Sequence, residues 1–413
     1  MAGFDCIIGN PPFLNQLENA TASTGAMAAI VRLRSDGVVR GYTDLSATFL
    51  YFASRWIEHG GRAAMVQPQS LLAARDAAPV RQAVLADCSL TALWISNEHV
   101  FEDASVYVCA PTLQRSGPRS GPIARSATAK FLPLPERVID HDQLAHAETW
   151  SHLAAAASGI PEVDLDHLPA LSEIAHATAD FRDQYYGLEG FLIENDSIDD
   201  ERRTEAAYPR IITTGLIDLA DCQWGTVSTR ILKRKWNAPR IDRGRMEREG
   251  TLGPWIAARS IPKILLATQT KVAEILVDAQ GSLVPSIPLI TIMPHRTEDL
   301  WMVGAAVASP VASAIALCKY AGAALSADAI KLSATQVLGL PQPCEKARWK
   351  SGARFLEAAH AARTTEERHT CLSDFGQQMA RAYGLPEVVA CEVEQWWVRR
   401  LMANSRSEEL DDD

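Results

Sequence analysis

The stretch FDCIIGNPPF, residues 4–13, decides the fold of this chain. Phe4 to Gly9 form a short apolar run, and Asn10, Pro11 and Pro12 form a stiff polar turn before the aromatic Phe13. An apolar run that stops at glycine and proline predicts a strand. Successive prolines fix the backbone and remove N–H donors. The end of this strand therefore presents an amide, a carbonyl and an aromatic ring in a fixed order.

Working outward, short apolar runs alternate with amphipathic segments up to about residue 115. Helical spacing predicts a helix over 44–61 that stops at Gly60 and Gly61, and a second helix over 70–87 that is broken at Pro79. Further strands are predicted over 62–68, 90–96 and 106–115. Strands that alternate with helices indicate part of an α/β sheet with helical crossovers.

The remaining sequence is more varied. Residues 116–122 (SGPRSGP) have the composition of a linker, and residues 147–159 (AETWSHLAAAASG) predict a helix. Short strands broken by turns are expected from about 205 to 345, and helices from about 346 to 402.

Bulk composition excludes several classes of protein. The chain has 413 residues, 47% apolar and 22% charged, which is typical of a soluble globular protein with room for two domains. A net charge of −10 excludes a uniformly basic coat but allows a local basic groove. The eight cysteines have no metal-ligand spacing, so we expect no metal site. The apolar stretch 302–318 is interrupted by Pro310 and is too short for a membrane span, and no secretion signal is visible, so we expect a cytoplasmic protein.

The residues Asn10 to Phe13 suit chemistry on an amino group of a nucleobase. The lone pair of an exocyclic amine is delocalised into the ring, and a site that accepts hydrogen bonds from both N–H groups makes the nitrogen more nucleophilic. The side-chain oxygen of Asn10 and the carbonyl of Pro11 are two such acceptors. Phe13 offers a ring face on which a base removed from the duplex can stack. The alternative is a plain turn after a strand.

This stretch resembles the (Asn/Asp)-Pro-Pro-(Tyr/Phe) motif of amino-group methyltransferases that use S-adenosylmethionine. The order of the segments that follow resembles N6-adenine DNA methyltransferases of the gamma arrangement, found in restriction–modification and phage-defence systems. The similar segments, which together cover most of the chain, are 44–72, 97–115, 299–317, 329–343 and 379–389.

The resemblance implies roles for individual residues. Asn10 and Pro11 would accept from the adenine N6 amine, Pro12 would shape the turn, and Phe13 would stack on the flipped adenine. Asp44 or Thr43 would line the cofactor side of the cleft, but a helix N-cap explains either residue equally well. Val106 to Val108 would pack near the base, with a plain buried strand as the better alternative.

The resemblance also raises a question about the cofactor. In the gamma arrangement the segments that bind S-adenosylmethionine come first, whereas here nine residues precede Asn10, and no suitable Gly-x-Gly turn occurs. We therefore expect residues 4–9 to form an exposed apolar edge that pairs with another chain. A split enzyme is the favoured interpretation: a second polypeptide would supply the cofactor-binding strands in a heterodimer. The alternatives are a product whose true start lies upstream and a remnant that kept only DNA recognition.

A basic segment in the second half points to double-stranded DNA. Ten basic and three acidic residues lie between positions 230 and 263, with tryptophans among them and just before them. Phosphates and guanine edges are the partners expected of such residues, whereas the alternative is a solvated basic face beside a local core. The candidate DNA-binding residues are Arg230, Lys233, Arg234, Lys235, Trp236, Arg240, Arg243 and Arg245.

Together these features predict a four-part α/β protein. Residues 1–120 would form a partial Rossmann-like methyltransferase domain and 121–204 a linker region with helix. Residues 205–345 would form a mixed α+β target-recognition domain, and 346–413 a helical segment with an acidic tail. The expected function is sequence-specific methylation of adenine N6 in DNA, with S-adenosylmethionine bound together with the partner chain. The alternative is a non-catalytic specificity subunit that binds DNA.

Overall fold

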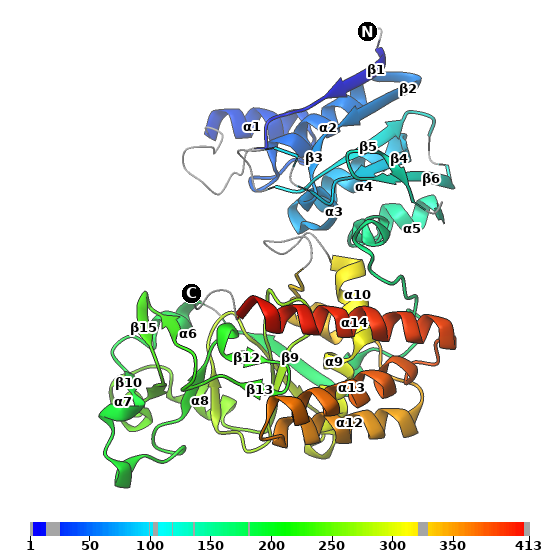
Figure 1. The fold of residues 1–413 in the computed structure, drawn as a ribbon. Helices are drawn as coiled ribbons and strands as arrows, with labels where there is room; N and C mark the ends of the chain where they lie inside the picture. The colour runs from blue at the N-terminus through cyan, green and yellow to red at the C-terminus, as the bar shows by residue number, and fades with distance from the viewer. Residues whose placement is uncertain are drawn as a thin grey trace. The chain divides into compact units, whose positions relative to one another are not determined.

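The computed structural model describes residues 3–13, 25–98, 100–101, 106–117, 119–134, 137–180, 182–320 and 329–408. The chain divides into two compact units (Figure 1). The N-terminal unit comprises residues 1–162 and 317–329, and the C-terminal unit comprises 163–316 and 330–413. The boundaries of the four segments expected from the sequence stay predictions, and the end of the acidic tail lies outside the described residues.

The N-terminal unit is built on one sheet with the strand order β1-β2-β5-β4-β6-β7, in which β3 also pairs with β5 and β8 with β6. The pairs β1–β2 and β4–β6 are parallel, whereas β5 is antiparallel to both β2 and β4. The strands are β1 (Phe4–Gly9), β2 (Ile57–Met65), β3 (Gln67–Pro68), β4 (Ser89–Ile95), β5 (Val108–Gln114), β6 (Gly121–Ala127), β7 (Leu132–Pro133) and β8 (Arg137–Ile139).

Since β5 is antiparallel to both of its neighbours, β2 and β4 run in the same direction, and their parallel partners β1 and β6 run in that direction as well. Their carboxyl ends therefore lie at one edge of the sheet, which we call the carboxyl edge. The helices of this unit are α1 (Gly25–Arg34), α2 (Leu45–Trp56), α3 (Ser70–Ala73), α4 (Ala78–Asp87) and α5 (His141–His146).

Two predicted helix boundaries are wrong. Helix α2 ends at Trp56, and Gly60 and Gly61 lie inside β2, where a side chain at Gly61 would meet the carbonyl of Phe4 on β1 at 2.9 Å. The glycine therefore allows close approach of two strands. The second helix is interrupted before Pro79, since α3 is followed by a 3₁₀ turn and Pro79 opens α4. Proline is well suited to the first helical turn, where its missing N–H has no partner to lose.

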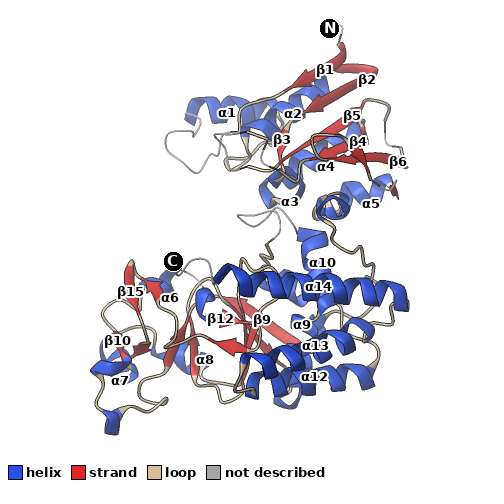
Figure 2. Ribbon diagram, viewed as in Figure 1, coloured by secondary structure: helices blue, strands red, loops and turns tan. Residues whose placement is uncertain are grey.

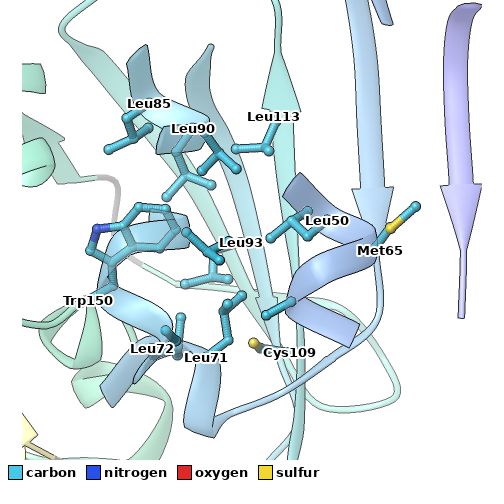
Figure 3. Close-up of a cluster of buried hydrophobic side chains, with 14 of the residues drawn as sticks. Leu50, Met65, Leu71, Leu72, Leu85, Leu90, Leu93, Cys109, Leu113 and Trp150 are labelled. Carbon is cyan, nitrogen blue, oxygen red and sulfur yellow. The ribbon is translucent and has the colours of Figure 1, made fainter. Parts of the chain in front are cut away.

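A continuous apolar cluster joins the sheet to its helices (Figure 3). Leu50 of α2 and Leu85 of α4 pack with Leu93 of β4 and Leu113 of β5, all fully buried. Trp150 packs into the same cluster and donates its indole N–H to the carbonyl of Leu144 at 3.2 Å. The segment 147–159 forms short 3₁₀ turns around this tryptophan rather than the predicted helix. Burial of Trp150 outweighs the helical preference of the alanines.

The C-terminal unit combines small sheets with helices (Figure 2). One sheet has the order β10-β16-β11-β19 and another β18-β17-β20-β9, and two hairpins pair β12 with β13 and β14 with β15. The strands are β9 (Ala175–Ala179), β10 (Leu192–Glu194), β11 (Arg210–Ile212), β12 (Ile217–Asp218), β13 (Asp221–Cys222), β14 (Thr229–Ile231), β15 (Arg234–Trp236), β16 (Pro239–Ile241), β17 (Lys263–Leu266), β18 (Ile275–Asp278), β19 (Leu283–Pro285) and β20 (Ile290–Pro294).

Helices complete this unit. They are α6 (Arg182–Tyr186), α7 (Arg243–Glu249), α8 (Gly253–Arg259), α9 (Leu300–Ala308), α10 (Pro310–Tyr320), α11 (Ala334–Leu338), α12 (Lys346–Ala361), α13 (Thr365–Arg381) and α14 (Glu387–Glu408). The last residues of α10, from Leu317, are assigned to the N-terminal unit. The helices predicted after residue 346 are confirmed as α12, α13 and α14, while 205–345 contains helices as well as the predicted strands. The apolar stretch 302–318 lies in α9 and α10, whose residues from Val303 to Cys318 are all buried.

Candidate functional site

Asn10 to Phe13 lie at the carboxyl edge of the N-terminal sheet. Gly9, the last residue of β1, pairs with Met65, and its carbonyl accepts the N–H of Val66 at 3.0 Å. Parallel pairing thus holds the strand end in place immediately before the turn. Asn10 is exposed, whereas Pro11 is buried and Phe13 is half-buried. The turn therefore presents an amide side chain to solvent on a backbone that is anchored underneath.

A second aromatic residue stands beside Phe13. The rings of Phe13 and Phe101 are 5.9 Å apart and meet edge to face at 74°. Phe101 follows β4, the strand next to β5, so two loops of the same edge bring the rings together. From the sequence, the segment 97–115 is expected in this region, but Phe101 is not singled out. Its only signal in the sequence is an aromatic residue in a polar stretch.

Asp44 and Thr43 are engaged in local structure. One carboxylate oxygen of Asp44 accepts from both the N–H and the hydroxyl of Ser46, at 2.8 and 2.5 Å, which caps α2. Burial raises the pKa of this carboxyl, and the hydrogen bonds from Ser46 oppose the rise. The buried hydroxyl of Thr43 accepts the N–H of Arg40 and donates to the carbonyl of Asp76. The geometry of both residues is that of the helix cap named as the alternative, and a role toward a cofactor stays a prediction.

Two glutamines that the sequence pattern does not single out hold the carboxyl edge together by hydrogen bonds to backbone carbonyls. The amide of Gln67 is fully buried and donates to the carbonyl of Ser46 at 3.0 Å, and its side-chain oxygen has no partner among the described residues. Gln69 donates to the carbonyls of Ser96 and Val108 at 2.6 and 3.3 Å. Val108 is fully buried in β5. These hydrogen bonds join the segment after β2 to α2, β4 and β5, so they hold the carboxyl edge in a fixed arrangement.

The outer side of β1 is open, as expected from the sequence. Within the described residues β1 pairs only with β2, and five of its six residues are apolar or glycine. Ile8 is 81% exposed and Phe4 59% exposed. Large apolar residues on an unpaired strand edge favour pairing with another strand. The edge is therefore a surface at which another strand can pair.

The basic segment separates into two groups. Arg230, Lys233, Arg234 and Lys235 are exposed and lie on the hairpin of β14 and β15. Leu232 and Lys233 form its tip, with φ of 52° and 64°, which is the geometry of a tight two-residue hairpin turn. Within the described part of the chain no carboxylate forms an ion pair with these four side chains, and the guanidinium of Arg234 lies over the ring of Trp236, 4.3 Å from its centroid. We call residues 229–236 the basic hairpin.

The remaining candidates take part in internal contacts. Trp236 is 5% exposed and belongs to the core of this region. Arg240 is 7% exposed and donates to Glu205, Asn195 and the carbonyl of Tyr208. Arg243 and Arg245 pair with glutamates one turn further along α7, at 2.8 and 2.9 Å. Trp236 and Arg240 thus belong to the fold around the basic hairpin, whereas Arg243 and Arg245 are occupied by ion pairs on the surface of α7.

An open pocket of about 490 Å³ adjoins the basic hairpin. Its walls include Tyr185 and Tyr186 of α6 and Thr229 and Arg230 of β14. The hydroxyls of Thr213 and Thr229 are hydrogen-bonded at 2.7 Å, and Thr214 contributes a buried hydroxyl that has no partner in the described residues. The pocket thus combines aromatic faces, hydroxyls and one exposed guanidinium.

No group of His, Cys, Asp and Glu side chains among the described residues has metal-binding geometry. In the same residues, no single helix has the length and apolar character that a membrane span requires; the helices Thr297–Ala308 and Pro310–Tyr320, bent by 53° at their junction, meet the test only as a pair.

Comparisons with known proteins agree with the α/β assignment. Residues 1–101 match the family model described as Eco57I restriction-modification methylase. No curated protein matches the chain. The solved structure of the Type IIL restriction-modification enzyme MmeI in complex with DNA is similar, with 12% identity and a TM-score of 0.56, over 96% of this chain and 57% of that one.

Two other solved structures are similar at 11% identity. The Type IIG restriction endonuclease BpuSI has a TM-score of 0.38 over 97% of this chain and 53% of its own. The DrdV–DNA complex has a TM-score of 0.43 over 86% and 44%. The chain therefore spans little more than half the length of MmeI and BpuSI. The likeness to MmeI confirms the fold class: the chain has an α/β fold that resembles part of the fold of this restriction–modification enzyme.

Proposed function

We propose that this chain is the catalytic and DNA-recognising subunit of a sequence-specific DNA adenine-N6 methyltransferase of a restriction–modification or phage-defence system. The observation that carries the proposal is the geometry of Asn10 to Phe13, which combines an exposed amide, a buried proline and an aromatic pair at the carboxyl edge. The match of residues 1–101 to a restriction-modification methylase model supports it.

In this proposal the side-chain oxygen of Asn10 and the carbonyl of Pro11 accept the two N–H groups of adenine N6. Both acceptors concentrate electron density on the nitrogen that is methylated. Phe13 stacks on the adenine after it leaves the duplex. Phe101 meets Phe13 edge to face and so limits the positions that its ring can take. Pro11 is buried, which keeps its carbonyl in a fixed direction.

S-adenosylmethionine supplies the methyl group. The described residues do not themselves make a cradle for it: none of them forms a glycine-rich turn between a strand and a helix at the carboxyl edge, and Asp44 is used as a helix cap. The open side of β1 is where further strands of the sheet can pair. We therefore assign the cofactor-binding strands to a second polypeptide that docks on β1.

The basic hairpin supports double-stranded DNA as the substrate. Its four exposed cations form a local concentration of positive charge in a chain whose net charge is −10. Cations in such a position neutralise phosphates, and an arginine next to a groove can read the O6 and N7 atoms of guanine. Arg230 lies at the open pocket beside the hairpin and is the best placed of the four for a base.

The test is transfer of labelled methyl groups from S-adenosylmethionine to mixed-sequence DNA. It compares the chain alone with the chain plus the polypeptide encoded immediately upstream, in three forms: unchanged, Asn10→Ala and Asn97→Ala. Asn97 is an exposed asparagine that follows β4 at the same edge, and it is the matched control. We expect methylation only in the mixture, a loss of at least 100-fold for Asn10→Ala, and little change for Asn97→Ala.

Equal activity of Asn10→Ala and the unchanged chain would refute the catalytic assignment. DNA binding by the chain without methylation in any mixture would favour the alternative function, a non-catalytic specificity subunit. Activity of the chain alone would leave the catalytic assignment intact and refute the second polypeptide.

A further inference from the structure

The turn after β6, residues 128–131, has two backbone outliers. Thr128 has φ of 66° and Phe131 has φ of 52°. β-Branched and aromatic residues avoid the left-handed region, because the Cβ substituents crowd the backbone. Residues held in such conformations concentrate at functional sites. The turn is called the Phe131 turn below.

The Phe131 turn is rigidly anchored. The N–H of Thr128 donates to the carbonyl of Ile95 at 3.1 Å, and that of Phe131 donates to the carbonyl of Thr128 at 3.1 Å. The indole of Trp94 donates to the same Thr128 carbonyl at 2.9 Å. The hydrogen bonds of the turn therefore maintain a strained backbone that keeps the Phe131 ring outside the core.

The tip of this turn is apolar and exposed. Phe131 is 65% exposed and Leu132 is 53% exposed. Lys130 is exposed as well, and residues 128–133 include no acidic side chain. One face of Phe131 rests near Trp94, with 5.7 Å between ring centres. An exposed aromatic ring next to one exposed cation suits a partner that has both flat apolar faces and negative charge.

The register of the sheet places this turn level with Asn10. Gln67 of β3 pairs with Cys109 of β5, Cys109 with Ile95 of β4, and Ile95 with Ala127 of β6. Gln67 is two residues beyond Met65, the partner of Gly9. The Phe131 turn thus projects from the carboxyl edge at the height of the Asn-Pro-Pro turn. Four strand spacings separate β6 from β1, which is about 19 Å.

We propose that the Phe131 turn is a second DNA contact of the N-terminal unit, in which Phe131 inserts as a wedge at a base step and Lys130 pairs with a neighbouring phosphate. The inference rests on the proposed function, because its occupant is the duplex that presents its target adenine to Asn10. A separation of about 19 Å corresponds to about five or six base pairs along a duplex. Apolar wedges at base steps unstack and bend DNA at a cost that wider protein contact offsets.

Photo-crosslinking tests the contact directly. The full chain would have p-benzoylphenylalanine in place of Phe131 or, as the matched control, in place of Val138. Val138 is 74% exposed and pairs with Pro122 near the start of β6, at the opposite end of that strand. Each protein is irradiated with a labelled mixed-sequence duplex. We expect strong crosslinks from position 131 and at least ten times fewer from position 138.

Affinity for the same duplex provides a second measurement. We expect Phe131→Ala to weaken binding about ten-fold, Phe131→Leu to weaken it less, and Val138→Ala to leave it unchanged. Crosslinks that are equally weak at both positions, with DNA still bound, would overturn this inference alone. A chain that binds no duplex at all would overturn the DNA part of the proposed function and this inference with it. Methylation that persists without the crosslink would refute only the wedge.

Discussion

Individual arginines of one sequence segment lie in opposite environments. Arg230 is exposed beside an open pocket, whereas Arg240, ten residues later, is 7% exposed and satisfied by Glu205, Asn195 and a carbonyl. Both residues look alike in the sequence, since charge and local composition are the same. The pairing of β16 with β10 and β11 buries Arg240, and this pairing joins segments distant in the chain. A basic run therefore identifies a candidate region but not its functional members.

A buried histidine predicts how stability depends on pH. The ring Nε2 of His360 accepts the N–H of Val277 at 3.0 Å, and Nδ1 lies 2.9 Å from the carbonyl of Leu356, so the neutral ring fits both partners. Burial lowers the pKa of His360 to about 4. In the unfolded chain the His360 ring is protonated near pH 6.5, whereas in the folded chain it is protonated only near pH 4. The contribution of His360 to the free energy of unfolding is therefore fully present above pH 6.5 and is lost as the pH falls toward 4.

Urea unfolding at several pH values checks this prediction. The free energy of unfolding of the C-terminal unit should fall by up to about 3 kcal/mol between pH 6.5 and pH 4 on account of His360. In His360→Gln that component should disappear, while the variant is less stable at pH 7. An unchanged pH dependence in the variant would show that other groups are responsible.

At the scale of elements, the carboxyl edge and the basic hairpin are the two parts of the fold to which the proposed function assigns roles. Parallel β1 and β2, with β4 and β6 in the same direction, gather the loops that contain Asn10, Phe101 and Phe131 at one edge. The basic hairpin needs only eight residues, because its two-residue tip reverses the chain directly. In both elements the side chains lie on short loops between strands that are held by pairing with their neighbours.

The basic hairpin predicts a salt effect. Replacing Arg230, Lys233, Arg234 and Lys235 with glutamine should weaken DNA binding and flatten its salt dependence. Each lost phosphate contact lowers the slope of log affinity against log salt by about 0.9, so the three cations other than Arg230 amount to about 2.7. The matched control replaces Arg243 and Arg245, which pair with Glu247 and Glu249 on α7. Fluorescence anisotropy over a range of salt concentrations gives both slopes, and equal slopes in the two variants would contradict the assignment.

At the scale of the whole molecule, the open side of β1 is the feature to which the proposed function assigns a partner. The apolar cluster of the N-terminal unit is closed by α2, α4 and Trp150, yet Ile8 and Phe4 stay exposed on β1. An exposed strand of this kind is costly unless a partner covers it.

Ile8→Lys tests whether that surface is an interface. A charge on this strand should leave the melting temperature of the isolated chain within a few degrees, because Ile8 is 81% exposed, but it should abolish methylation in the mixture with the second polypeptide. The matched control is Val388→Lys on α14, where the valine is also 81% exposed. Co-purification and methyl transfer are the measurements. Undiminished association of Ile8→Lys would show that β1 is not the docking edge.

The sequence by itself determined the strand at 4–9, the turn that follows it, the α/β class and the C-terminal helices, because short apolar periods and proline geometry are local properties. Only the tertiary structure decided that Phe101 meets Phe13 and that Asp44 caps α2. It also decided that two of the eight DNA-binding candidates, Trp236 and Arg240, are buried, and that Arg243 and Arg245 form ion pairs on α7. It also decided that α2 ends before Gly60 and that 147–159 wraps Trp150 instead of forming a helix. These outcomes depend on strand pairing and burial between residues far apart in the chain, and such contacts leave no mark on local sequence pattern.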